Sequence, residues 1–450
     1  MSLAPVYQSR SIGFTLLLGF CILAAACMDQ PKVNSNSRED SNSGRRSDST
    51  PAASPSAAAE PPVAEPNIQF TLPLLEAILS DDSFVSSSRR EVQLTDEELQ
   101  KLRDISRNAV LKLNDESPDI NRSTKGAVAE ARKKVQEVLG NDRANRFIAL
   151  VQKLAQAGDD LPASKPNLIP DDTRIIVNIP AYRMDVFQQG NLLKSYKIGI
   201  GYPEFPLPTG LRKASTIIFN PTWTPPDEPW VKGKVEPGKK IEAGSALNPL
   251  GPVKIPIGLP SLIHGGKSPT QLGGFASHGC VGLTNPQVQD LALQISKLSG
   301  QSLTLQDIRS YEKSKTETKE VKLDEPIPVE LRYETIVVEN GVLKIYRDVY
   351  ERGTNTEENL RRVLENYSLS LDDIPEDMRA KIIASLDKMS LTPSGENPDT
   401  SERDDKTKNN SNSDNAKITR TIKGQKEMDF RLPQLAGKGY PVPVGMKNAG

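Results

Sequence analysis

The chain contains two histidines, and both lie close to one of its three cysteines. His264 and His278 precede Cys280 within the single segment 264–280. A thiol of ordinary pKa is only a few per cent ionised at neutral pH, but a neighbouring imidazole can take its proton and leave a nucleophile. Because chance would rarely place all three in so short a segment, we predict that they form one site.

The residues beside the cysteine favour acyl transfer over redox chemistry. The sequence reads SHGCVG over residues 277–282. Gly279 lets the backbone approach a substrate carbonyl closely, and the backbone amides of residues 279 and 280 can donate to the oxyanion that forms during attack.

Three other interpretations of the cluster stay open at this point. A zinc site needs about four nitrogen or sulfur ligands, and their usual paired spacings are absent here. A redox sensor needs a resolving cysteine, which the mature chain lacks. An inert buried cysteine with two hydrogen-bonded histidines is the third. Acyl transfer explains the clustering best, so we expect neither a metal nor a cofactor.

The N-terminus has the pattern of an export signal. Arg10 is followed by an apolar run over residues 12–23, and then by alanines at 24–26 and Cys27. This run is too short for a comfortable membrane span. The sequence LAAAC at 23–27 resembles the bacterial lipoprotein motif, in which Cys27 is lipidated, although the alanines also fit an ordinary signal peptidase site. We expect a lipid-anchored protein of the periplasm or cell envelope.

Charge and composition restrict the partners further. Acidic and basic residues nearly cancel, 58 against 57, so no positive field exists to attract nucleic acid. With 36% hydrophobic residues and 35 prolines, the chain has room for modest cores and much linker. In an oxidising compartment the single mature thiol, Cys280, cannot form an internal disulfide, so it is either inert or kept for its reactivity.

Short strands must position the cluster. Hydrophobic residues alternate with period two from Arg174, which predicts an antiparallel meander through residues 174–200 with a turn at 189–191. Further strands are predicted at residues 216–219, 253–255, 262–263 and 303–305. Asn285 as N-cap and Pro286 at the first position predict a helix that ends before Gly300.

The site motif resembles that of one known family. His264-Gly265-Gly266, followed later in the segment by Ser277-His278-Gly279-Cys280, closely resembles the L,D-transpeptidase catalytic domain of bacterial cell-wall assembly. The flanking segments 208–210 and 248–251 agree, and the resemblance covers about residues 174–308. It implies a mainly β catalytic domain, with small sheets in a β-sandwich-like fold and one or two helices.

The regions around that domain are assigned from their patterns. Helical spacing with a capping box at Thr95 and Glu98 precedes the domain, and a hairpin of residues 327–338 and 342–346 joined by Asn340-Gly341 follows it. The predicted class is α+β multidomain with disordered linkers. The predicted regions are a signal peptide at 1–27, a disordered tether at 28–67, a helical accessory region at 68–160, the L,D-transpeptidase catalytic domain at 170–310, a hairpin plus helical extension at 311–390, and a mostly disordered tail at 391–450.

The resemblance also implies roles for the site residues. Cys280 corresponds to the nucleophile and His264 to the proton donor and acceptor, with the Gly265 carbonyl orienting the imidazole. His278 shapes the pocket, and Ser277 and Gly279 support the motif. One position departs from the family pattern: Gly282 stands where Arg or Asn is usual. Arg212 and Lys267 are the candidates for a replacement charge.

The implied activity is acyl transfer between peptidoglycan stem peptides. The Cys280 thiolate attacks the third residue of a tetrapeptide stem, D-alanine leaves, and an amine resolves the thioester to give a 3-to-3 crosslink or an anchored lipoprotein. With water as acceptor the same site is an L,D-carboxypeptidase. A non-catalytic wall-binding lipoprotein is the alternative of another class.

Overall fold

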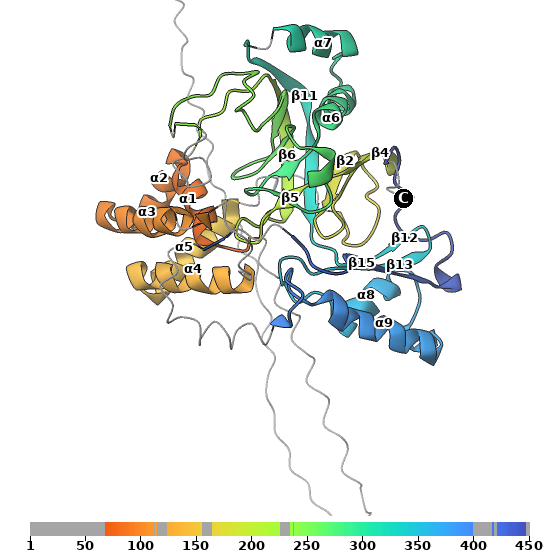
Figure 1. Cartoon of the computed structure of the whole chain (residues 1–450). Helices are drawn as coiled ribbons and strands as arrows, with labels where there is room; N and C mark the ends of the chain where they lie inside the picture. The colour runs from red at the N-terminus through yellow and green to blue at the C-terminus, as the bar shows by residue number, and fades with distance from the viewer. Residues whose placement is uncertain are drawn as a thin grey trace, which may run out of the picture. The chain divides into compact units, whose positions relative to one another are not determined.

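The computed structural model describes residues 68–111, 113–114, 124–154, 164–225, 235–236, 238–314, 316–398, 416–417 and 421–446 (Figure 1). All of them belong to one compact unit, residues 63–450. The predicted signal peptide with Cys27, the predicted tether and the centre of the predicted tail lie outside the described residues. None of the helices in the described ranges is both long enough and apolar enough to cross a membrane.

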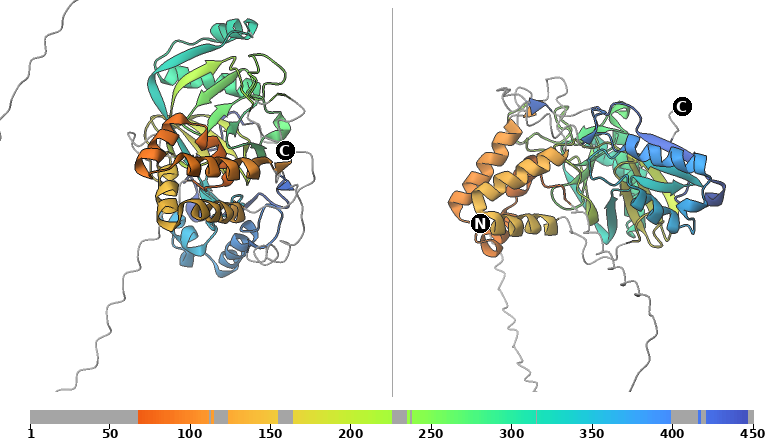
Figure 2. Two further views of the ribbon diagram at one scale, coloured as in Figure 1. Left: turned by 90° about the vertical axis from the view of Figure 1, so that its left-hand side faces the viewer. Right: turned by 90° about the horizontal axis from the view of Figure 1, so that it is seen from below.

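The helical region contains the helices α1 to α5, which lie next to one another in both views of Figure 2. They are α1 Leu72–Leu79, α2 Asp82–Glu91, α3 Asp96–Leu111, α4 Thr124–Leu139 and α5 Asn141–Leu154. Their apolar faces form one buried cluster, in which the rings of Phe84 and Phe147 meet edge to face at 5.6 Å. The predicted capping box is confirmed, because the Glu98 amide donates to Thr95 Oγ1 at 3.2 Å and the Thr95 amide donates to Glu98 Oε2 at 3.1 Å.

An eight-stranded sheet with the order β10-β8-β7-β6-β11-β2-β3-β4 forms the centre of the catalytic region. Its strands are β2 Arg174–Asn178, β3 Arg183–Gln188, β4 Asn191–Lys197, β6 Gly210–Phe219, β7 Val253–Pro256, β8 Leu262–His264, β10 Val281–Gly282 and β11 Lys319–Arg332. A separate parallel pair consists of β5 Ile200–Gly201 and β9 Phe275–Ser277. The predicted antiparallel meander is confirmed as β2-β3-β4.

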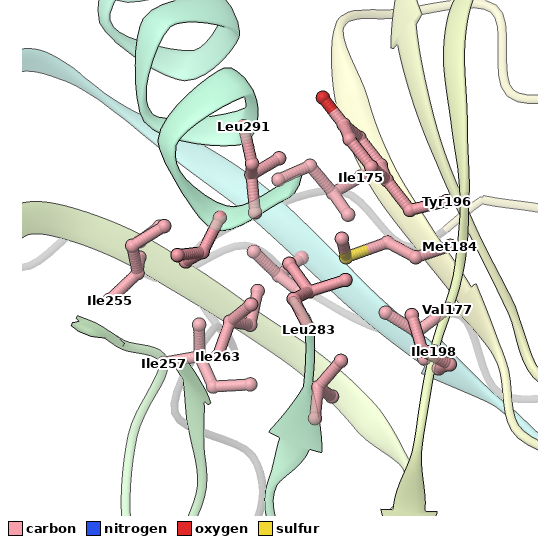
Figure 3. Close-up of a cluster of buried hydrophobic side chains, with 14 of the residues drawn as sticks. Ile175, Val177, Met184, Tyr196, Ile198, Ile255, Ile257, Ile263, Leu283 and Leu291 are labelled. Carbon is pink, nitrogen blue, oxygen red and sulfur yellow. The ribbon is translucent and has the colours of Figure 1, made fainter. Parts of the chain in front are cut away.

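One face of this sheet is covered by α6, which spans Asn285–Leu298. Figure 3 shows Leu291 of this helix pointing into the buried cluster that contains Met184 and Ile263 of the strands. Replacing a fully buried leucine such as Leu291 by alanine costs roughly 2–5 kcal/mol, so this contact fixes the helix on the sheet. The helix in turn follows directly on the segment that contains Cys280.

Two predicted strands are wrong in their assignment. Residues 303–305 are not a strand, because Thr304 caps the helix α7 Leu305–Lys313 in a capping box with Asp307. Residues 327–332 do not belong to the predicted hairpin but to β11, which pairs antiparallel with β6 and parallel with β2. Alternation of apolar residues continues from β11 into the next strand, so the pattern alone did not show the break.

The C-terminal region forms its own small sheet and core. The hairpin of β12 Ile336–Glu339 and β13 Val342–Tyr346 turns at Asn340-Gly341, both with positive φ, as predicted. The helices α8 Glu357–Glu365 and α9 Glu376–Met389 pack on it, with short 3-10 turns at Leu371–Asp373 and Pro433–Leu435.

Part of the predicted tail is folded. Strand β15, Glu427–Arg431, pairs antiparallel with β13, and β14, Ala416–Lys417, pairs with β1, Leu113–Asn114. The tail predicted to be mostly disordered thus contains a strand within the described residues 421–446. The polar sequence did not indicate this strand, because β15 buries only Phe430 and its backbone pairs with that of β13. The fold class itself is confirmed: a mainly β catalytic region is preceded by a helical one.

Candidate active site

Strand register places the predicted site residues on one side of the sheet. In the parallel pair β8 and β10, Ile263 lies opposite Val281, and His264 lies opposite Gly282. Ile263 and Val281 are fully buried in the core. Because successive side chains point to opposite faces of a strand, His264 and the residues that flank Val281 point away from this core. Cys280, directly before β10, therefore lies at the same edge as His264.

The imidazole of His264 is held in one orientation. Its Nδ1 lies 2.7 Å from the Gly265 carbonyl oxygen. A carbonyl oxygen only accepts, so Nδ1 carries the hydrogen and Nε2 is left as the acceptor of the neutral ring. The contact is the one that the family resemblance implied for Gly265. A base with its free nitrogen fixed in this way is ready to take a proton from a thiol.

Burial keeps both reactive groups neutral. Burial and, to a smaller extent, the charge of Lys267 lower the pKa of His264 to about 3, against the opposing effect of the Gly265 hydrogen bond. Burial also raises the pKa of the Cys280 thiol, while a backbone hydrogen bond at Leu262 and the charge of Lys267 oppose this rise. The pair at rest is thus a thiol and a neutral imidazole.

The turn that carries the cysteine is fixed by serine hydroxyls. Ser277 Oγ donates to the Cys280 carbonyl at 2.5 Å and accepts from the Cys280 amide at 3.1 Å. Gly279 has φ of +90°, which only glycine adopts without strain, and its carbonyl accepts from Ser261 Oγ at 2.9 Å. The Cys280 amide, one of the two that are expected to donate to the oxyanion, donates to Ser277 Oγ in this structure.

His278 sits between aromatic rings. Its ring meets Tyr202 at 5.1 Å and Phe205 at 4.7 Å, both edge to face. Tyr350 fixes the loop that carries these rings, since its hydroxyl donates to the Gly201 carbonyl at 2.7 Å and accepts from the Leu207 amide at 3.2 Å. No sequence pattern marked these aromatic residues, because they lie in irregular segments far from the motif.

The loop after His264 is tied to the start of α6. The Gly266 amide donates to Asn285 Oδ1 at 2.7 Å, and the Lys267 amide donates to the Leu283 carbonyl at 3.1 Å. The predicted N-cap is therefore shifted by one residue: Thr284 caps α6 in a capping box with Gln287, and Asn285 serves the loop instead. Segment 248–251 also packs here, because a Cβ on Gly251 would lie 2.5 Å from the Gly266 nitrogen.

The two candidates for a replacement charge behave differently. Arg212 is fully buried on β6, and its Nη1 donates to the carbonyls of Gly258 at 3.3 Å and Leu259 at 3.2 Å. Burial lowers the pKa of Arg212 to about 10. Lys267, in contrast, interacts electrostatically with both Cys280 and His264. Of the two, Lys267 is the cation that acts on the candidate nucleophile.

Comparison with known proteins identifies the same region of the chain as the sequence motif does. Residues 172–316 match the family model of the L,D-transpeptidase catalytic domain. No curated protein matches the chain.

Solved L,D-transpeptidases are also similar to this chain. A mutant enzyme from Enterococcus faecium has 17% identity over 36% of this chain and 50% of its own, with a TM-score of 0.23. The separate catalytic domain from E. faecium has 18% identity over 36% of this chain and 98% of its own, with a TM-score of 0.23. An enzyme from Mycobacterium tuberculosis has 14% identity over 36% of this chain and 57% of its own, with a TM-score of 0.21. The chain thus spans about half the length of the larger enzymes that it matches.

Proposed function

We propose that the L,D-transpeptidase catalytic domain at residues 172–316 works through Cys280 as nucleophile and His264 as proton acceptor and donor. The observation that carries this assignment is the 2.7 Å contact of His264 Nδ1 with the Gly265 carbonyl, which leaves Nε2 for the thiol proton. The β8–β10 register supports it, because Gly282, two residues after Cys280, lies opposite His264. Ser277, Gly279 and His278 hold and shape the site around them.

The substrate is a peptidoglycan tetrapeptide stem. The Cys280 sulfur attacks the carbonyl carbon of the third residue while its proton passes to His264 Nε2. The bond to the terminal D-alanine then breaks, and the same proton goes to the leaving amine. An acceptor amine attacks the thioester in the second half-reaction, gives its proton to His264, and the thiol of Cys280 is restored. Both half-reactions use the same base, because attack by the acceptor amine is chemically the reverse of the loss of D-alanine.

The family acts on peptidoglycan, so the domain works outside the cytoplasm. The acceptor is the amine of a second stem, which gives a 3-to-3 crosslink, or that of a lipoprotein to be anchored. We place the catalytic domain at 170–310, after a lipidated Cys27, a tether at 28–67 and a helical accessory region at 68–160. Two hydrogen bonds support a positioning role for that region, because Thr71 and Thr124 donate to the carbonyls of Glu204 and Pro203 at 2.9 Å and 3.1 Å. Glu204 and Pro203 belong to the loop that carries Tyr202 and Phe205.

Release of D-alanine from a tetrapeptide stem tests the proposal. The full chain should release D-alanine in proportion to time, and Cys280→Ala should abolish release while its thermal unfolding stays unchanged. Cys27→Ser, assayed in detergent solution, is the matched control and should keep the full rate, since Cys27 has no part in the chemistry. An amine acceptor should convert the product into a crosslinked peptide, whereas free tripeptide alone would indicate a carboxypeptidase. A folded chain that releases no D-alanine from any stem would favour a wall-binding protein.

A further inference from the structure

The side chain of Lys267 fills the place that a side chain on residue 282 would need. A Cβ built on Gly282 would lie 2.8 Å from Cγ, 3.0 Å from Cε and 3.4 Å from Cδ of Lys267. Real Cβ atoms essentially never approach other heavy atoms closer than 3.0 Å, so any larger residue at 282 would displace the lysine stem. The Lys267 side chain can therefore follow this path because residue 282 is a glycine.

Backbone hydrogen bonds fix the point from which this stem starts. The Lys267 amide donates to the Leu283 carbonyl at 3.1 Å, and the Leu283 amide donates to the His264 carbonyl at 2.8 Å. Gly266, with φ of +80°, makes the turn between His264 and the lysine. The Lys267 backbone is thus bonded to Leu283, the residue directly after β10, and the Lys267 side chain runs from there over Gly282.

The ammonium group at the end of the stem acts on both reactive groups. Burial lowers the pKa of Lys267, and the charge on Cys280 opposes this fall. In return Lys267 favours the thiolate of Cys280 and disfavours protonation of His264. A cation in this place makes the proton leave the sulfur more easily without making the imidazole positive at rest.

We infer that the positive charge of Lys267 stabilises the thiolate of Cys280. Glycine at position 282 leaves the space that the Lys267 side chain needs in order to pass. The inference rests on the proposed role of Cys280. Where the family pattern usually has Arg or Asn two positions after the cysteine, this chain has Gly282, and the charge comes from the loop after the histidine instead.

The rate of alkylation of Cys280 by iodoacetamide, followed against pH, tests this directly. The full chain is used with Cys21→Ser and Cys27→Ser, which leaves Cys280 as the only thiol. Lys267→Met keeps the stem but removes the charge, so the midpoint of the alkylation curve should rise and the rate at pH 7 should fall about tenfold, the effect of one pKa unit. Lys254→Met is the matched control: Lys254 lies opposite His264 and its pKa is lowered by burial alone, so the midpoint should stay unchanged.

A double-mutant cycle tests the packing of the stem on residue 282. Gly282→Ala should raise the midpoint in the parent chain, because the new Cβ displaces Lys267, but should leave it unchanged in a Lys267→Ala background, where the space is open. An unchanged midpoint in folded Lys267→Met, or equal effects of Gly282→Ala in both backgrounds, would overturn the inference. Alkylation needs no peptide donor, so a failure of D-alanine release alone would count against the proposed function and leave this result standing.

Discussion

Two regions of the molecule bury ionisable side chains, and they compensate the buried charges differently. At the candidate active site, burial lowers the pKa of His264 and Lys267 and raises the pKa of Cys280, so that it favours the neutral form of each side chain. The second region, which we call the charged seam, consists of Arg174, Glu330, Arg332 and Glu334. There each guanidinium faces carboxylates: Arg174 contacts Glu330 at 2.7 Å, and Arg332 contacts Glu330 at 3.1 Å and Glu334 at 3.2 Å.

The charged seam joins the catalytic sheet to the C-terminal segment. Burial alone would lower the pKa of Arg332, but the charges of Glu334 and Glu330 and contact with Tyr440 hold it above its ordinary value. The Tyr440 hydroxyl also donates to Glu334 at 2.9 Å. This pairing keeps Arg332 charged and holds the segments together, although burial still raises the pKa of Glu334. At the candidate active site neither the thiol nor the imidazole has a carboxylate partner in the described residues, and both stay neutral. The comparison therefore separates residues that stabilise the fold from residues that we propose to react.

The largest effect is expected at the reactive region. His264→Ala removes a positioned base, so acylation of Cys280 should slow by roughly 10²- to 10⁴-fold in the folded variant. Single-turnover release of D-alanine measures the rate. His278→Ala is the comparison variant and should slow the step less, because its ring packs against Tyr202 and Phe205. A larger loss for His278→Ala than for His264→Ala would reverse the roles.

The opposite outcome is expected at the charged seam. Arg332→Ala leaves the buried Glu334 without its cation, while Glu330 keeps Arg174, and this should lower the free energy of unfolding by about 3–5 kcal/mol. Urea titration measures this. Arg89→Ala breaks an exposed pair with Asp96 and should cost less than about 1 kcal/mol. If the two substitutions cost the same, the seam contributes nothing beyond a surface ion pair.

A pH titration of stability sharpens the contrast. The folded pKa of His264 is about 3, below the unfolded value of about 6.5, so between these values the unfolded chain binds a proton that the folded chain does not. The contribution of His264 to the free energy of unfolding is fully present above a pH of about 6.5. As the pH falls from there toward about 3, this contribution decreases by about 1.4 kcal/mol for each pH unit. Urea titrations at neutral and acid pH should show a smaller loss in His264→Gln. Equal losses in both chains would mean that the imidazole ionises freely.

The smallest effect is expected far from both regions, at the start of α3. Thr95→Ala removes the capping hydroxyl from the Glu98 amide and should cost about 1 kcal/mol of stability without changing D-alanine release. Ser86→Ala is a suitable control, because the Ser86 hydroxyl only bonds the Asp82 carbonyl inside its own helix. Thermal unfolding measures the stability of the two variants. If both substitutions destabilise the chain equally, loss of the cap is not the cause.

The sequence predicted the parts that depend on local pattern. Strand alternation located β2, β3 and β4, and Asn340-Gly341 located a hairpin. The motif spacing is the basis on which His264 and Cys280 are proposed as the site. The sequence did not predict features that depend on distant partners. β15 obtains its order from β13, although the helices α8 and α9 separate the two strands in the chain. Tyr350 likewise reaches Gly201 from the region after the catalytic sheet. The path of Lys267 over Gly282 is a property of the folded loop, and only the missing side chain was visible in the sequence.

Intact mass of the full chain after mixing with a tetrapeptide stem tests the central claim most directly. In the chain with Cys21→Ser and Cys27→Ser, we predict a mass increase equal to the tripeptide acyl group, with one D-alanine released for each adduct. Cys280→Ala should give neither, and an added amine should discharge the adduct. An adduct that persists in folded Cys280→Ala, or D-alanine release by that variant, would contradict the assignment of Cys280 as the nucleophile.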